Sequence, residues 1–230
     1  MTRPRVQETD HGIQGEFNVT MYDQMQKSMR DRGWIQTHLL LENGITQGCA
    51  LEIGPGPGYL GLEWLRHTQG TTLKGLDISA DMIALARRNA QEYGLSERAE
   101  YIHSSGSQVP FDNGTFDAVF TNGSMHEWAE PRGTLDEIWR VLKPGGRALI
   151  SDLRRDMPAP VQWFLWLTVK PREMRPGLVT SLNAAYTSQE LRILAEGTDL
   201  ESCTVSDRLF GLVLVAVKQR DSTGSSIEEG

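Results

Sequence analysis

A short apolar run that ends in alternating glycines carries the clearest chemistry in this sequence. Residues 50–53 lead into Gly54, Gly56 and Gly58, and a second apolar run, 73–76, ends at Asp77. Glycine lets the backbone turn sharply and approach a ligand where a Cβ would collide. A carboxylate at the tip of the next strand can accept both hydroxyls of a ribose. The two features together predict a nucleoside-binding corner of a Rossmann-like sheet.

The spacing of the glycines indicates which nucleoside fits. A dinucleotide site uses G-x-G-x-x-G, in which the third glycine packs a helix on a strand. Here that third position is occupied by Tyr59, and the glycines alternate with prolines instead. A nucleotide-cofactor oxidoreductase is therefore disfavoured, although it stays open as an alternative.

Four segments in order resemble the class I S-adenosylmethionine (SAM) methyltransferases, and in particular the group that includes the ubiquinone and menaquinone biosynthetic enzymes. Residues 52–58 match the E-x-G-x-G-x-G of motif I, and 77–82 match "D-x-S-x-x-M". Residues 109–119 are similar to "L-P-F-x-D…F-D-x-V", and 137–146 to "E-x-x-R-V-L-K-P-G-G". The resemblance covers residues 45 to 155 most closely. It implies SAM as cofactor and S-adenosyl-L-homocysteine as product.

The resemblance also implies a set of cofactor-binding residues. Asp77 is expected to accept from the ribose, and Met82 either packs on the adenine or belongs to the core. Glu52 either lies near the SAM amino group or orients the glycine loop. Ser105 stands where relatives commonly have an acid for the adenine amino group, which predicts weaker affinity. The full expected set is Glu52, Gly54, Pro55, Gly56, Gly58, Tyr59, Asp77, Ile78, Met82, Ser105, Gly106, Ser107 and Asn122.

Methyl transfer from a sulfonium is an in-line displacement with a neutral leaving group. The enzyme must align the reactants and exclude water, and it needs a base only when the acceptor keeps its proton. His126 is the candidate base, or else it braces its loop. Asp152, expected at the end of a central strand, can orient an acceptor hydroxyl or amine. No "N/D-P-P-Y" motif is present near Asn122, which disfavours transfer to a nucleic-acid base or glutamine amide.

Several further residues are candidates for contact with the acceptor. Arg154 either clamps a substrate anion or joins a surface ion-pair network with Asp156. Tyr22 and Tyr186 are expected to face the pocket. The aromatic segment 161–169, which contains Trp163, is interpreted foremost as a lid, with a homodimer contact and an interfacial helix as alternatives. Because Asp152 and Asp156 lack a third ligand, no metal site is predicted.

Composition and periodicity set the fold class. The chain has 230 residues, 39% hydrophobic content and a net charge of −7, which disfavours a broad nucleic-acid surface. No apolar run reaches the roughly 20 residues of a membrane span, and the two cysteines have no metal spacing, so a cytoplasmic protein without stable membrane insertion is expected.

Alternating elements predict an α/β fold: a Rossmann-like seven-stranded, mostly parallel sheet with helices on both faces and an antiparallel C-terminal hairpin.

The expected organisation follows from these elements. An N-terminal helical lid, 1–48, precedes a SAM-binding domain, 49–220, with a substrate-lid insertion at about 153–187 and a disordered tail, 221–230. The predicted strands are 50–53, 73–76, 99–103, 118–120, 148–151, 201–207 and 212–218. The predicted helical stretches are 20–43, with a break near Gly33, and 59–67, 81–93, 134–142 and 188–196. The predicted function is methyl transfer to a small, hydrophobic or aromatic acceptor. A non-catalytic SAM-binding protein is the alternative.

Overall fold

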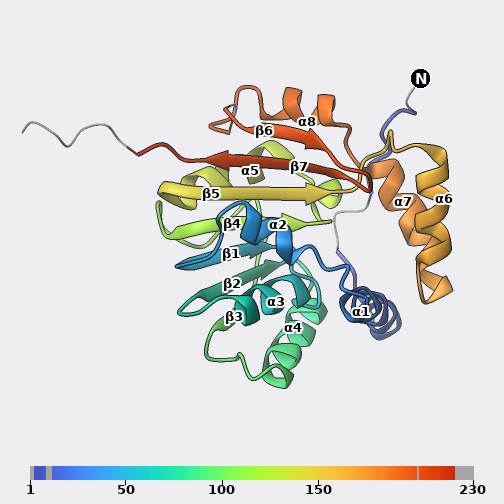
Figure 1. Ribbon diagram of the computed structural model, residues 1–230, viewed down its shortest axis with the longest axis horizontal. Coiled ribbons are helices and arrows are strands. Elements are labelled where there is room, and N and C mark those ends of the chain that lie inside the picture. Colours follow the sequence, from blue (N-terminus) through green and yellow to red (C-terminus); the bar gives the residue numbers. More distant parts are fainter. Residues whose placement is uncertain (1–2, 9–11, 201, 221–230) are drawn as a thin grey trace, which may run out of the picture.

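Seven strands form one sheet in the order β3-β2-β1-β4-β5-β7-β6 (Figure 1). This computed structural model describes residues 3–8, 12–200 and 202–220. The tail 221–230, expected to be disordered, lies outside the described residues. The strands are β1 (Cys49–Ile53), β2 (Thr72–Asp77), β3 (Ala99–His103), β4 (Phe116–Asn122), β5 (Leu142–Asp152), β6 (Thr204–Asp207) and β7 (Leu212–Val217).

The strand directions confirm the predicted architecture. Strands β1 to β5 are parallel, whereas β7 runs antiparallel to β5 and forms an antiparallel hairpin with β6. The order reverses between β1 and β4, because the chain first builds outward through β2 and β3 and then returns to the other side of β1. In such sheets, ligands bind beyond the carboxyl ends of the strands at this reversal.

Helices cover both faces of the sheet, as expected. The apolar sides of α2 (Thr37–Glu42), α3 (Tyr59–His67) and α4 (Ala80–Glu92) are buried in one core cluster with β1, β2 and β4. Residues of α5 (Pro131–Val141) and α8 (Ser188–Ala195) are buried on the other face. Burial of these apolar side chains is the main force that holds the layers together.

Capping side chains mark the starts of two helices. The Ser79 hydroxyl accepts a hydrogen bond from the Met82 N–H at 3.2 Å, which caps α4 directly after the tip of β2. Thr187 and Glu190 form a reciprocal capping box at the start of α8. The break expected near Gly33 in the helical stretch 20–43 is confirmed. Two helices, α1 (Glu16–Asp31) and α2, are separated at Gly33, whose φ of 70° no helix accommodates.

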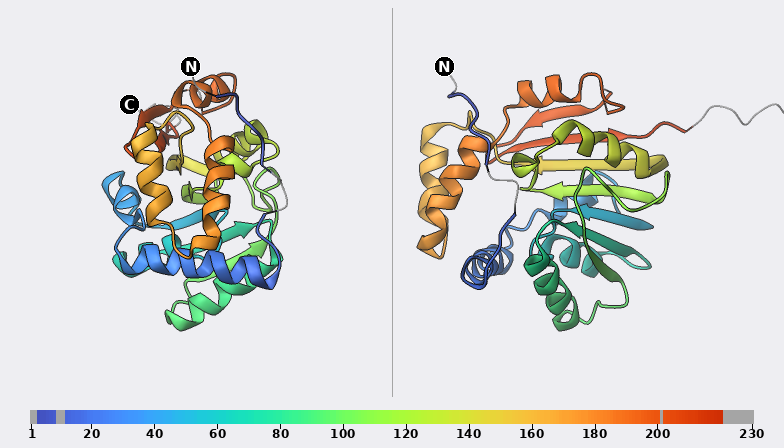
Figure 2. Two further views of the ribbon diagram at one scale, coloured as in Figure 1. Left: turned by 90° about the vertical axis from the view of Figure 1, so that its right-hand side faces the viewer. Right: turned by 180° about the vertical axis from the view of Figure 1, so that it is seen from behind.

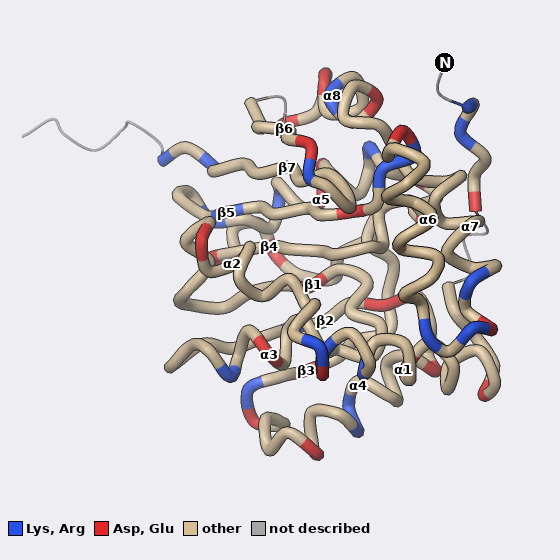
Figure 3. The backbone as a smooth tube through the Cα atoms, turned by 45° about the vertical axis from the view of Figure 1, so that its right-hand side comes forward, with Lys and Arg blue, Asp and Glu red and all other residues tan. Residues whose placement is uncertain are grey.

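Three helices lie together beyond the carboxyl ends of the parallel strands (Figure 2). They are α1, α6 (Ala159–Thr168) and α7 (Arg175–Ala184), and the short turn η2 (Arg172–Met174) joins the last two. Sequence analysis located an apolar segment here but did not predict α7. Helix α6 carries no charged residue, whereas basic residues follow it in the chain (Figure 3). None of the residues of α6 is fully buried.

Candidate active site

The loop between β1 and α3 can be built only from glycine at its turning points. Gly54, Gly56 and Gly58 have φ values of 66°, 52° and 84°, in the left-handed region that other residues rarely adopt. The Gly54 N–H donates to the Leu76 carbonyl at 2.7 Å, which fastens the loop to the end of β2. A Cβ on Gly54 would also collide with Ser124. The loop is therefore held close to the strand ends with its backbone exposed to the adjoining space.

Asp77 joins the glycine loop to the end of β2. Its Oδ2 accepts from the Gly56 N–H at 3.0 Å, and its Oδ1 accepts from the Ser79 N–H at 2.9 Å. Burial raises the pKa of this carboxyl, while these backbone N–H groups act in the opposite direction. Each carboxylate oxygen has a second lone pair, so Asp77 can still accept from a ligand hydroxyl.

A cavity lies where the loop, Asp77 and the start of α4 converge, and we name it the cofactor cavity. Its walls also include the segment 104–107 and the turn 123–124. Eight of the residues predicted to bind cofactor line it together: Gly54, Gly56, Asp77, Ile78, Met82, Ser105, Gly106 and Ser107. The Ser105 hydroxyl lies 3.0 Å from the Ser107 hydroxyl, and both remain at the cavity wall.

Four other residues of the predicted set lie behind this wall. Glu52 is only 2% exposed beneath α3, and burial raises its pKa to about 8. Its carboxylate lies against Gly61 of α3, and it does not line the cofactor cavity. Pro55 packs beside Gly75, and Gly58 begins α3 against the Tyr101 ring. The Tyr59 hydroxyl donates to Asp23 at 2.8 Å and so ties α3 to α1.

A second cavity, of about 630 Å³, opens beside the first, and we name it the acceptor cavity. One wall comes from α1 through Tyr22, Met25 and Met29, and another from α6 and α7 through Leu165 and Leu178. Its floor is the carboxyl edge of β4 and β5. The two cavities share the residues Gly12, Ile13, Tyr22, Gly123 and Glu127. They are therefore contiguous at this boundary.

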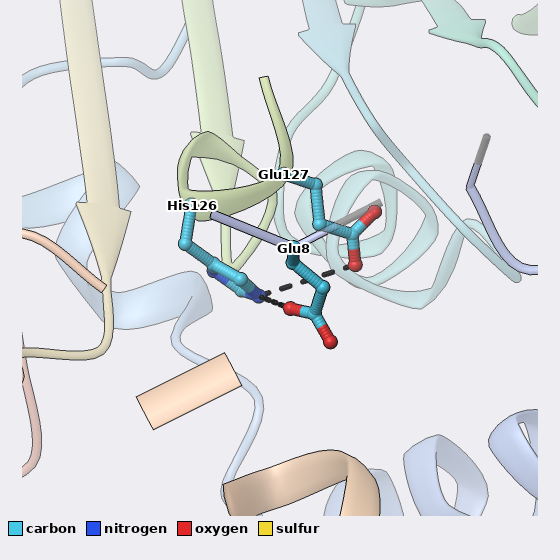
Figure 4. A group of neighbouring side chains, drawn as sticks. All are labelled: Glu8, His126 and Glu127. Carbon is cyan, nitrogen blue, oxygen red and sulfur yellow. Dashed lines mark ion pairs between the residues drawn. The ribbon is translucent and has the colours of Figure 1, made fainter. Parts of the chain in front are cut away.

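His126 and Asp152 form a buried pair on the floor of the acceptor cavity. The imidazole Nδ1 lies 2.8 Å from Asp152 Oδ1, and the His126 backbone N–H donates to Asp152 Oδ2 at 2.9 Å. These bonds fix the ring so that Nε2 faces Glu8 and Glu127, at 3.5 and 3.9 Å (Figure 4). Burial opposes the charged imidazole, but Asp152 and the other two carboxylates prevail and raise the pKa of His126 to about 9.

Sequence reasoning missed Glu8 and Glu127. Burial raises the pKa of Glu127 to about 7, and this carboxyl stands at the boundary between the cavities. Its position directly after His126 was the one signal available. Glu8 comes from the N-terminal segment, where its side chain accepts from the Thr180 hydroxyl at 2.7 Å. Nothing in the local sequence indicates that this segment reaches the strand ends.

The residues predicted to contact the acceptor divide into two groups. Tyr22 and His126 line the acceptor cavity, as does Asn122, which was expected to contact cofactor. The Asn122 amide oxygen accepts from the Ser151 hydroxyl at 2.7 Å. Burial raises the pKa of the Tyr22 hydroxyl, which accepts a hydrogen bond from Gln26.

Arg154, Trp163 and Tyr186 line neither cavity. Arg154 is held by Asp156 at 2.7 Å and by Asp207 at 2.8 Å, which is the ion-pair network considered as its alternative role. Trp163 points outward and is 65% exposed. Tyr186 lies under the guanidinium of Arg5, 4.1 Å from the ring centre. The structure thus assigns these three side chains to surface and packing contacts.

The central part of the chain is similar to known methyltransferases. Residues 51–150 match the family model described as "Methyltransferase domain". A demethylmenaquinone methyltransferase of Thermus thermophilus is 34% identical over 102 residues, which cover 44% of this chain and 46% of that protein. The ubiquinone/menaquinone biosynthesis C-methyltransferase UbiE of Marinomonas sp. is 25% identical over 148 residues, or 63% of this chain and 57% of that protein. The chain thus spans about half the length of these curated relatives.

Solved structures with the same fold also include a methyltransferase. The crystal structure of a putative S-adenosyl-L-methionine-dependent methyltransferase from Methanococcus maripaludis matches with a TM-score of 0.71 at 18% identity, covering 96% of this chain and 98% of that one. Residues 51–150 thus resemble a methyltransferase domain, and the fold is the Rossmann-like one of that putative S-adenosyl-L-methionine-dependent methyltransferase. Within the described residues, no helix combines the length and apolarity that crossing a bilayer requires.

Proposed function

We propose that this protein is a SAM-dependent methyltransferase that methylates a small, hydrophobic or aromatic molecule. The observation that carries the proposal is the shared boundary of the two cavities at the carboxyl edge of the sheet. One cavity has the glycine loop and ribose-binding carboxylate of a nucleoside site. The other has room for a second reactant, so a methyl group can pass between them without crossing solvent.

The residues of the cofactor cavity suit the parts of SAM. Asp77 is placed to accept from the ribose hydroxyls, and Ile78 and Met82 offer apolar surface to the adenine beside the 105–107 segment. Gly54 and Gly56 leave room for the methionine portion. When bound, SAM supplies an electrophilic methyl group on a positively charged sulfur. Tyr22 and Glu127, on the boundary, are then the side chains nearest the transfer path.

His126 and Asp152 act on the acceptor in this proposal. Asp152 orients the ring, and the Nε2 atom meets the polar group of the acceptor at the cavity floor. Because the pKa of His126 is about 9, the charged ring donates a hydrogen bond to that group at neutral pH and can take its proton only once the ring is deprotonated. Because the ring is buried and fixed, little ordering is needed when the acceptor arrives.

The rest of the acceptor cavity favours an apolar molecule. Met25, Met29, Leu165, Leu178 and Phe210 contribute to its walls. We infer that α1 and the α6–α7 insertion act as the lid, which holds the acceptor by apolar contact and excludes water. Trp163 faces away from the cavity and is left out of acceptor binding.

Titration calorimetry of the purified chain tests this proposal. Micromolar binding of SAM and of S-adenosylhomocysteine is expected, with no detectable binding of NAD or NADH. A screen of apolar hydroxyl- and amine-bearing compounds with labelled SAM would then reveal the acceptor by transfer of the label. Folded protein that binds neither SAM nor its product would contradict the proposal, and tight NAD binding would favour the oxidoreductase alternative.

A further inference from the structure

Three side chains from two distant parts of the chain converge on the floor of the acceptor cavity. They are Glu8 from the N-terminal segment and His126 and Glu127 from the short helix η1 (Met125–Glu127). One ligand atom from each lies within 4.8 Å of the others, and all three residues line the cavity (Figure 4). We propose that these residues bind one divalent transition-metal ion, of the Zn²⁺ or Mn²⁺ kind.

The orientation of His126 is the first support. Its side chain is 4% exposed, its Nδ1 is held by Asp152, and its Nε2 points toward Glu8 and Glu127. A histidine that ligates a metal through one nitrogen almost always places the other against a carboxylate or carbonyl, which fixes the ring. Asp152 is therefore the positioning residue of this site. It also accepts the backbone N–H of His126, so it holds the ring and the main chain together.

An unsatisfied carboxylate oxygen is the second support. Glu8 Oε2 is buried and has no hydrogen-bond partner within the described part of the chain, although Glu8 Oε1 accepts from Thr180. The Oε2 atom makes an ion-pair contact with His126 Nε2 at 3.5 Å. Burying a polar atom without a hydrogen bond is costly, and a bound cation would satisfy this oxygen.

The distances and the donor types indicate the class of cation. Metal–ligand bonds of about 2.0–2.2 Å are typical of histidine and carboxylate ligands of zinc. Two ligands at that distance lie roughly 3–4 Å apart, and the separations from His126 Nε2 are 3.5 and 3.9 Å. Imidazole suits zinc and similar transition metals, whereas Mg²⁺ and Ca²⁺ prefer oxygen ligands alone.

Three protein ligands leave coordination positions open, as in catalytic rather than structural metal sites. The open side faces the acceptor cavity, next to the boundary where Glu127 also borders the cofactor cavity. With the ion bound, His126 Nε2 would ligate the metal instead of meeting the acceptor directly, and an oxygen of the acceptor can complete the coordination there. This inference rests on the proposed function for the position of the acceptor. It differs from the expectation, drawn from the sequence, that the protein has no metal site.

The test is calorimetric titration of the full, tag-free chain, stripped with chelator, with Mn²⁺, Zn²⁺ and Mg²⁺ in turn. One equivalent of Mn²⁺ or Zn²⁺ is expected to bind, with Mg²⁺ much weaker. Glu8→Gln and Glu127→Gln should each weaken binding by about 10–100-fold or more, because loss of a ligand costs at least as much as loss of its supporting group. Glu173→Gln, an exposed carboxylate that lines neither cavity, is the matched control and should bind as the unmodified chain does.

Electron paramagnetic resonance of Mn²⁺ gives a second readout, since protein-bound Mn²⁺ loses the free-ion signal. Absence of stoichiometric binding, or binding that is equal in all three variants, would overturn the site. SAM titration of the same samples separates the two proposals. SAM binding without metal binding would contradict only the proposed cation site. Metal binding without SAM binding would support the cation site and contradict the proposed function.

Discussion

Asp152→Asn is expected to lower the turnover number of methyl transfer by about 10²–10⁴-fold when turnover is measured above the pKa of His126, about 9, since that is the range that a positioned proton-transfer group contributes. Asp152 holds both the Nδ1 atom and the backbone N–H of His126, and its Oδ1 also accepts from the Leu153 N–H at 2.6 Å. Asparagine offers one acceptor oxygen where the carboxylate offers two. The ring then loses its fixed tautomer and its orientation toward the acceptor.

The SAM dissociation constant should stay unchanged, because Asp152 lines only the acceptor cavity. Turnover is measured with labelled SAM and the acceptor found by the screen, and the ¹⁵N spectrum of the His126 ring reports the tautomer directly. Asp156→Asn, four positions on and paired with Arg154 outside both cavities, is the matched control. Full turnover in Asp152→Asn, or an equal loss in the control, would show that the pair of His126 and Asp152 takes no part in methyl transfer.

Asp77→Ala is expected to weaken SAM binding by about 1–3 kcal/mol, the usual cost of leaving buried polar partners unpaired. The substitution removes the proposed acceptor for the ribose hydroxyls. It also leaves the N–H groups of Gly56 and Ser79 without their carboxylate, so the glycine loop loses an anchor. Asp77→Asn keeps the shape and one acceptor oxygen, and its effect should lie between those of the native and alanine chains.

Calorimetry with SAM measures both variants, and thermal melting checks that they remain folded. Asp112→Asn removes an exposed carboxylate that lines neither cavity and should leave the affinity unchanged. Native affinity in Asp77→Ala would show that the ribose does not lie at the end of β2.

The corner formed by β1, α3 and β2 was predictable because its signals are local. Gly54 and Gly56 need backbone angles that few other residues adopt, and Ser79 caps α4 from three residues away. A class of cofactor site that depends on such turns can be recognised from spacing alone. Five residues predicted to bind cofactor line one cavity for this reason, namely Gly54, Gly56, Asp77, Ile78 and Met82.

The acceptor side was less predictable because distant segments build it. Glu8 meets His126 only after the N-terminal segment crosses the strand ends, and no local pattern encodes that path. Arg154 illustrates the same limit, since its partner Asp207 belongs to β6, far along the chain. Trp163 lies in an apolar helix, but the periodicity of α6 does not indicate which side meets the cavity.

A crystal structure of the full chain with S-adenosylhomocysteine would test the central claim most directly. We expect the ribose hydroxyls on Asp77, the adenine beside Ile78 and Met82, and the sulfur directed at the boundary marked by Tyr22 and Glu127. Product bound with its sulfur turned away from the acceptor cavity, or bound outside the cofactor cavity, would contradict the assignment of this site to methyl transfer.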